Sequence, residues 1–143
     1  RRFINQDVVE QVFSARGFQI VAPEELSVKQ QIQLFSRAKV IAAPTGAAVA
    51  NLVFAPRGCQ ILILAARTRH AAFHYWLNMA QAAGHHAQYL FGQGVGSAPH
   101  PAHTDLYLDD YRALPRSSIR LSVTRELHES RLFCPCSVCQ NCS

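Results

Sequence analysis

The sequence predicts an α/β fold, with a Rossmann-like parallel sheet that carries helices on both faces. Short apolar runs with strand character alternate with segments of helical periodicity, and the connections between them are short. The run Gln60–Leu64 is apolar from its second residue onward, as expected for a strand covered on both faces. The 143 residues, 49% hydrophobic and 16% charged, are sufficient to build one core without disulfides.

The first predicted unit is a helix followed by a strand. Asn5 is placed as the N-cap of the helix, and Gly17 ends it because glycine accepts the left-handed conformation. The strand follows at Phe18–Val21. The apolar residues of the helix recur at helical spacing on one face, and they are Val8, Val9, Val12 and Phe13.

The second unit repeats this order. Ser27 is the expected cap of a helix that turns Ile32 and Phe35 inward. A strand follows at Lys39–Ala43, then a short helix in "TGAAVANLVF", and then the strand Gln60–Leu64.

The third unit is a helix that ends at Gly84 and a strand at about His86–Leu90. A loop rich in Gly, Pro and His follows, "GQGVGSAPHPAHT". Beyond it we expect a short strand at Asp105–Leu108 and a helix that starts at Asp109 and ends before Pro115. The periodic pattern is lost after Pro115.

The stretch "PTGAA", Pro44 to Ala48, lies where a ligand site is expected. In open parallel sheets, ligands bind in the crevice outside the carboxyl ends of the strands. Small residues allow a ligand to approach the backbone, and the first N–H groups of a helix favour an anion, above all a phosphate. A tight turn selected for packing is the alternative explanation.

The charge balance agrees with an anionic ligand without requiring one. The formal net charge is +5, and nearly all of the excess is arginine, whose fork suits phosphate. A basic surface that keeps the protein soluble would give the same balance. Basic residues are not interleaved with aromatic ones, so we expect no nucleic-acid partner. No apolar run approaches the ~20 residues of a transmembrane helix.

The chain also resembles glycosyltransferase family 61 over roughly residues 1 to 115. The family's opening pattern is matched by Arg1, Arg2, Ile4 and Asn5. Its middle part is matched by Gly17, Phe18, Val21, Pro23, Glu24, Leu26 and Ser27, and then by Gln31, Leu34, Phe35 and Ala38. Its signature is matched by Gly46, Ala47, Asn51, Phe54, Pro56 and Gly58. Two positions depart from the family, which usually has His at Thr45 and often has Gly at Ala43.

The resemblance implies a GT-B architecture, in which two Rossmann-like halves enclose the active site. Residues 1–115 would be the half that binds the nucleotide-sugar donor, and residues 116–143 an extension with a Cys-rich tail. The enzyme would transfer the sugar to a hydroxyl of a polysaccharide or glycan, in capsular or exopolysaccharide biosynthesis, in the cytoplasm or at the membrane periphery. No metal or other cofactor is implied. The chain starts at a helix cap without an initiator Met, which we interpret as a fragment that is inactive alone.

The donor would be held by the "PTGAA" loop. Backbone N–H groups of Gly46, Ala47 and Ala48 are the expected donors to the diphosphate, and Thr45 would add its hydroxyl. Arg1 and Arg2 match the family's basic pair near the phosphates, although as terminal residues they could equally be solvated. Asn51 either contacts the donor or ties its helix to a neighbouring loop. The alternative for the whole chain is a non-catalytic nucleotide-binding or interaction module that lost its chemistry with the family His.

Other candidates are weaker. Glu24 and Glu25 are expected to act as charges near a helix start, and Asp109 and Asp110 as helix caps. His70 and His74 have the spacing of a metal pair but no third ligand nearby in sequence, and His85, His86, His100 and His103 are assigned to loops. Cys59 is expected in the core. The tail offers one further candidate metal set, Cys134, Cys136, Cys139 and Cys142, whose two pairs lie closer together than in usual zinc sites.

Overall fold

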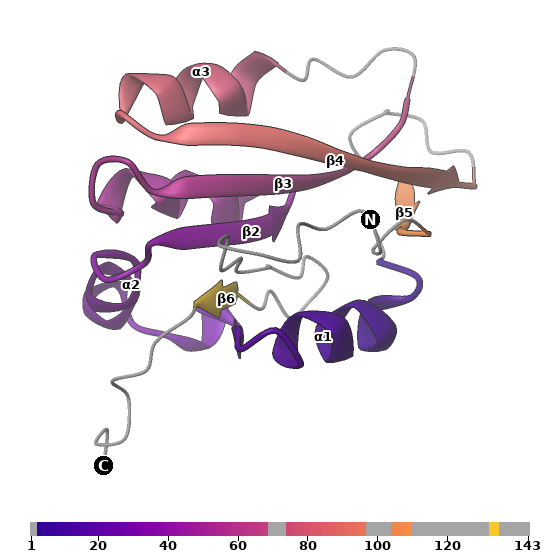
Figure 1. Cartoon of the computed structure of the whole chain (residues 1–143), viewed down its shortest axis with the longest axis horizontal. Helices are drawn as coiled ribbons and strands as arrows, with labels where there is room; N and C mark the ends of the chain where they lie inside the picture. Colours follow the sequence, from indigo (N-terminus) through magenta and orange to yellow (C-terminus); the bar gives the residue numbers. More distant parts are fainter. Residues whose placement is uncertain (1–2, 69–73, 97–103, 110–131, 135–143) are drawn as a thin grey trace.

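The computed structural model describes residues 3–68, 74–96, 104–109 and 132–134. They form one sheet of six strands in the order β1-β6-β2-β3-β4-β5, with helices against both of its faces (Figure 1). The strands are β1 Gln19–Val21, β2 Val40–Pro44, β3 Gln60–Ala66, β4 His86–Val95, β5 Asp105–Tyr107 and β6 Leu132–Cys134. The helices are α1 Gln6–Ser14, η1 Pro23–Glu25, α2 Val28–Phe35, η2 Ala47–Phe54 and α3 His74–Ala82, of which η1 and η2 are 3₁₀ helices.

The centre of the sheet confirms the predicted parallel arrangement. Strands β2, β3 and β4 run parallel, with Pro44 opposite Leu64 and Leu64 opposite Leu90. The three remaining pairings are antiparallel: β5 pairs with β4, and β6 pairs with both β1 and β2, between which it lies. The fold is therefore α/β with a mixed sheet: its central strands are parallel, and β5 and β6 run antiparallel to their neighbours. Residues 132–134, which the sequence assigned to an extension beyond the domain, contribute a strand to this sheet.

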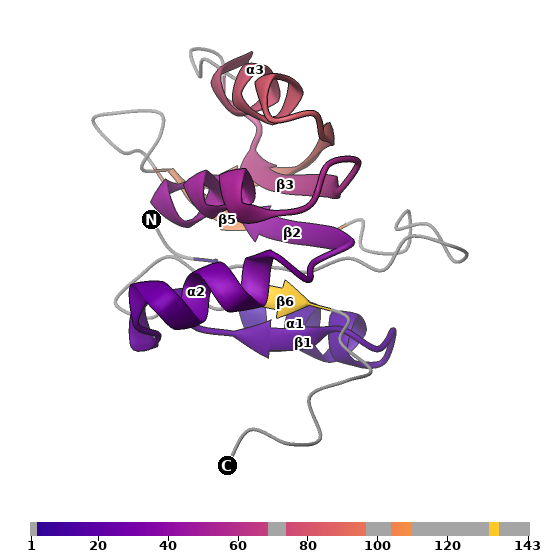
Figure 2. The same ribbon diagram turned by 90° about the vertical axis from the view of Figure 1, so that its left-hand side faces the viewer.

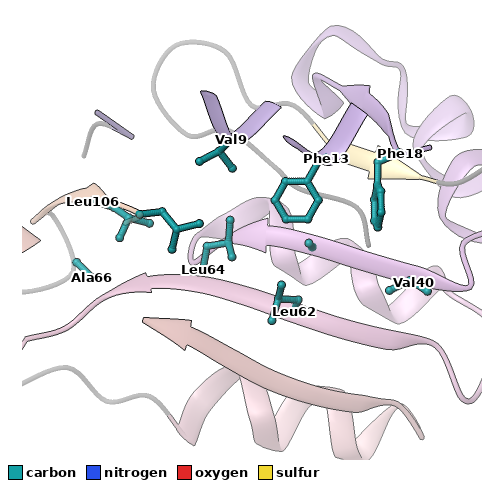
Figure 3. Close-up of a cluster of buried hydrophobic side chains, with 10 residues drawn as sticks. Val9, Phe13, Phe18, Val40, Leu62, Leu64, Ala66 and Leu106 are labelled. Atoms are coloured by element: carbon teal, nitrogen blue, oxygen red, sulfur yellow. The ribbon is translucent and has the colours of Figure 1, made fainter. Parts of the chain in front are cut away.

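One face of the sheet packs against α1. Val9 and Phe13 of α1 meet Leu62, Leu64 and neighbouring strand residues in a buried cluster (Figure 3). Phe13 also contacts the ring of Phe18 edge-on at 5.2 Å between centroids. Val8 was expected in this face but is 42% exposed. It precedes Val9 by one residue and is therefore rotated by about 100° around the helix axis.

The opposite face packs against α2, η2 and α3 (Figure 2). Ile41, Ile61 and Ile63 of the strands are buried there beneath Phe35 of α2 and Leu52 of η2. Alternate strand residues thus serve the two cores, which explains why the strands read as continuous apolar runs.

The predicted N-cap of α2 is confirmed, but only part of its predicted inward face is buried. Ser27 forms a capping box with Gln30, in which the Ser27 hydroxyl accepts from the Gln30 N–H. Phe35 is buried as expected, whereas Ile32 is 40% exposed. The side chain that faces η2 is Gln31, which hydrogen bonds to Asn51.

Glycines end the helices and shape the sheet edge. Gly17 and Gly84 have φ of +81° and +78°, the left-handed conformation predicted for helix stops. The loop predicted after β4 begins later than expected, since the strand continues to Val95. Gly92 lies within this strand because β5 passes so close that a Cβ would collide with the carbonyl of Tyr107.

The N-terminal segment is hydrogen-bonded to the residue that follows β5. Asn5 occupies the N-cap position of α1, but its side chain makes no capping hydrogen bond. Its amide instead donates to the Leu108 carbonyl at 2.6 Å and accepts from the Leu108 N–H at 3.0 Å. Asp109 is not helical, and the rest of the helix predicted to follow it lies outside the described residues.

Candidate functional site

The predicted loop follows directly from β2. The N–H of Thr45 donates to the Leu64 carbonyl at 2.8 Å, which extends the β2–β3 pairing by one residue. Gly46 is fully extended, with φ 165° and ψ −176°, and the chain then enters η2. The predicted strand–loop–helix order is therefore confirmed, but the helix is 3₁₀: the N–H of Val49 bonds to the Gly46 carbonyl three residues before it.

The start of η2 presents backbone N–H donors just beyond the carboxyl end of β2. The N–H groups of Thr45 and Val49 are used within the fold. In the described part of the chain, those of Gly46 and Ala48 have no backbone acceptor. Gly46 and Ala48 are half-buried and Ala47 is exposed, so this turn is accessible to a ligand. Free donors at a helix start are a suitable environment for an anion.

The Thr45 side chain is held by a helix from elsewhere in the chain. Its Oγ1 accepts a hydrogen bond from the indole Nε1–H of Trp76 at 2.9 Å. Trp76 lies in α3, thirty-one residues further along the chain, and contacts the ring of Tyr75 edge-on. A threonine hydroxyl keeps its own proton for donation after accepting one bond.

Asn51 is engaged inside the fold. Its Nδ2–H donates to Oε1 of Gln31 at 3.1 Å. Gln31 in turn donates to the carbonyls of Pro23 at 2.8 Å and Leu26 at 3.0 Å. This chain of bonds ties η2 to α2 and to the turn that contains η1. It agrees with the structural interpretation of Asn51, and a contact with the donor stays a prediction.

A cation lies at the end of the next strand. Arg67 follows β3 directly, and its guanidinium lies 5.7 Å from the ring centroid of Phe91 in β4. Phe91 stacks on Tyr89, which packs against the same core as η2 and α3. Burial raises the pKa of Tyr89 to about 12, so its hydroxyl stays protonated even at alkaline pH. Sequence reasoning missed Arg67, although a lone Arg closing the run "ILILAAR" marks the carboxyl end of a strand.

The structure also places the remaining histidine and carboxylate candidates of the described chain. His85 lies between α3 and β4, outside both elements, as predicted; it is buried, and its Nε2 lies 2.9 Å from the Leu52 carbonyl. Because a carbonyl only accepts, that nitrogen carries the proton. The Asp109 carboxylate accepts from Nε2 of Gln93 at 2.6 Å, and the helix that Asp109 was expected to cap lies outside the described residues. His86 is the exposed first residue of β4, and Glu24 and Glu25 are exposed in the first turn of η1.

Several candidates cannot be placed. The residues outside the described ranges are Arg1, Arg2, His70, His100, His103, Asp110, Cys136, Cys139 and Cys142. Cys134 belongs to β6, and Cys59 is buried in the core, as predicted. Among the placed residues, no group of three or more His, Cys, Asp or Glu side chains could hold a metal ion.

A groove of about 540 Å³ lies elsewhere, between α1 and β1. It is lined in part by Asp7 and Glu10, whose negative charges oppose a phosphate. The Thr45 loop offers backbone donors and a hydroxyl, and Arg67 follows the adjacent strand β3, so this end of the sheet suits a phosphate group.

The comparisons with known proteins cover the same loop. The family model described as Glycosyltransferase 61 matches residues 1–62. This match supports membership of glycosyltransferase family 61 for this segment. The match contains β2, the Thr45 loop and η2 with the whole family signature. It ends at Leu62, so the resemblance expected for residues 63 to 115 is not covered by it. Neither a curated protein nor a solved structure matches the chain. In the part of the chain that can be placed, no helix is long and apolar enough to cross a membrane.

Proposed function

We propose that this chain is the donor-binding half of a glycosyltransferase that transfers a sugar from a nucleotide-diphosphate sugar to a hydroxyl of a polysaccharide or glycan. The observation that carries the proposal is the position of the family 61 signature. It coincides with the turn from β2 into η2, at the carboxyl edge of the parallel strands, where α/β sheets bind ligands. The proposal includes a GT-B architecture and a role in capsular or exopolysaccharide biosynthesis.

The diphosphate would lie against the start of η2. The N–H groups of Gly46 and Ala48 would donate to phosphate oxygens, supported by the positive end of the helix dipole. The Thr45 hydroxyl would add a side-chain donor. Arg67 would supply positive charge from the neighbouring strand, and Arg1 and Arg2 remain predicted contributors. No cofactor is assigned, because these groups take the role of holding the diphosphate.

The chemistry would be a displacement at the anomeric carbon. The acceptor hydroxyl attacks this carbon, the bond from the carbon to the diphosphate breaks, and a base takes the hydroxyl proton. Negative charge develops on the departing diphosphate, and preorganised donors at the Thr45 loop would stabilise it. The base is assigned to the other half of the enzyme.

A second candidate function is a non-catalytic module that binds a nucleotide or a partner. It is favoured by Thr45, which stands where the family usually has His and whose oxygen already accepts from Trp76. A hydroxyl can bind a phosphate oxygen but supplies no imidazolium charge to the leaving group. This module would keep binding without transfer.

Calorimetric titration of the 143-residue chain with uridine diphosphate, guanosine diphosphate and pyrophosphate tests the proposal. We expect one of the nucleotides to bind more tightly than pyrophosphate, because a donor site also contacts the nucleoside. Absence of binding to all three would refute the donor-binding role. Hydrolysis of a nucleotide sugar by a longer protein carrying both halves would distinguish the enzyme from the non-catalytic module.

A further inference from the structure

The hydrogen bond between Trp76 and Thr45 joins α3 to the predicted ligand loop. Trp76 is the chain's only tryptophan, and its indole N–H donates to the Thr45 hydroxyl oxygen at 2.9 Å. Both side chains are half-buried, so the bond lies at the margin of the core. The Thr45 backbone is fixed at the same time, since its N–H bonds to the Leu64 carbonyl.

This bond determines which role the Thr45 hydroxyl can play. A hydroxyl has one proton to donate and two lone pairs that accept. An indole N–H only donates, so it occupies a lone pair and cannot receive the hydroxyl proton. The proton is therefore directed away from Trp76. Accepting a hydrogen bond also polarises the O–H group and makes it a stronger donor.

We propose that Trp76 is a positioning residue for the ligand loop: it holds the Thr45 hydroxyl as a donor toward a phosphate oxygen of the bound nucleotide. The inference rests on the proposed donor-binding function and deepens it. It predicts that the contribution of Thr45 to affinity depends on Trp76. It also predicts that Trp76 senses the ligand, because a phosphate on Thr45 changes the hydrogen bond to the indole.

A purely structural role would look different. If the bond only anchored α3 to the sheet, removing it would lower stability and leave nucleotide affinity unchanged. The test therefore measures affinity and indole emission, and it measures urea unfolding separately.

The experiment titrates the 143-residue chain with uridine diphosphate and guanosine diphosphate, by calorimetry and by tryptophan emission. Trp76→Phe removes the N–H and keeps a ring, and Thr45→Val removes the hydroxyl and keeps the shape. Thr45→Ser restores the hydroxyl. Tyr75→Phe is the matched control, because Tyr75 is the adjacent aromatic residue and is 56% exposed. Thr45→Val retains Trp76, so if Trp76→Phe does not fold, the loss of the ligand-induced emission change in Thr45→Val tests the link between the two residues.

We expect wild-type emission to change with ligand and to saturate at the calorimetric Kd. Trp76→Phe and Thr45→Val should each weaken binding about tenfold, as for loss of a hydrogen bond to a charged group. The double variant should be no weaker than either single one, and Thr45→Ser and Tyr75→Phe should bind like wild type. Wild-type binding with unchanged affinity in Trp76→Phe and Thr45→Val would overturn this inference alone. Absence of wild-type binding to both nucleotides and to pyrophosphate would overturn the proposed function and this inference with it.

Discussion

The two ends of η2 differ in how completely their polar groups are used. At the carboxyl end, the Leu52 carbonyl accepts from the Ala55 N–H at 3.0 Å and faces Nε2 of His85 at 2.9 Å, and the Leu52 side chain is fully buried. At the amino end, the N–H groups of Gly46 and Ala48 have no backbone acceptor in the described part of the chain.

This difference separates stability from binding within one short helix. A buried polar group without a partner is costly, so the core end of a helix needs internal acceptors and donors. Open N–H groups can persist at the amino end because it lies at the accessible sheet edge, where water or a ligand can meet them. Changes at the core end should therefore affect folding, and changes at the open end should affect ligand affinity.

The largest effect is expected for Leu52→Ala. It removes a fully buried side chain beneath the sheet and should lower the free energy of unfolding by about 2–5 kcal/mol. Urea unfolding measures this. Val53→Ala is the control: Val53 is 53% exposed, and its substitution should change stability by less than about 0.5 kcal/mol. Equal losses for the two variants would show that the carboxyl end of η2 is not the anchored end.

Gly46→Val tests the open end. Gly46 has an extended backbone that any residue adopts, so folding stability should change little. A β-branched side chain would block the approach of a diphosphate to the N–H groups, and the lost charged hydrogen bond is worth about 1.5–3 kcal/mol. We expect binding of uridine or guanosine diphosphate to weaken tenfold or more by calorimetry. Gln60→Val is the control, because Gln60 is the first residue of β3 and lies at the amino ends of the parallel strands; this variant should bind like wild type. Equal affinities for Gly46→Val and Gln60→Val would contradict the site.

Thr45→His sharpens the electrostatic part of the comparison. A free imidazole is charged below pH about 6.5, so the family residue should tighten nucleotide binding at pH 5.5 and lose this gain at pH 8. A bound phosphate raises the imidazole pKa, whereas the Trp76 N–H favours the neutral ring as its acceptor and lowers it. Adding Trp76→Phe should therefore extend the gain to higher pH. A gain that is independent of pH would mean that the ring acts by packing.

The smallest effect is expected for the exposed arginines at the two sheet edges. Arg67→Gln removes the cation that directly follows β3 and should weaken nucleotide binding about two- to fivefold, as for an exposed ion pair of about 0.5–1 kcal/mol. The loss should shrink at high salt. Arg57 lies in the turn after η2, at the other edge, so Arg57→Gln should have no effect on affinity. Equal losses would point to net charge and not to a local contact.

Local signals in the sequence predicted much of the fold and the place of the candidate site. The apolar runs predicted the positions of β2 and β3 closely, because a parallel strand that is buried on both faces has a continuous run of hydrophobic residues. Ser27 and Gly84 marked helix ends through conformations that depend on neighbouring residues only. The "PTGAA" loop was located for the same reason: it joins a recognisable strand to a recognisable helix start.

The tertiary structure alone decided which side chains meet. Asn5 bonds to Leu108, 103 residues away, where the local pattern suggested a helix cap. Thr45 meets Trp76 from a helix 31 residues further on, and β6 enters the sheet between β1 and β2. The exposure of Val8 likewise depends on which face of α1 the sheet covers. Periodicity and caps record interactions within a few residues, whereas these contacts form only when distant segments pack together. No pattern in either partner alone specifies them.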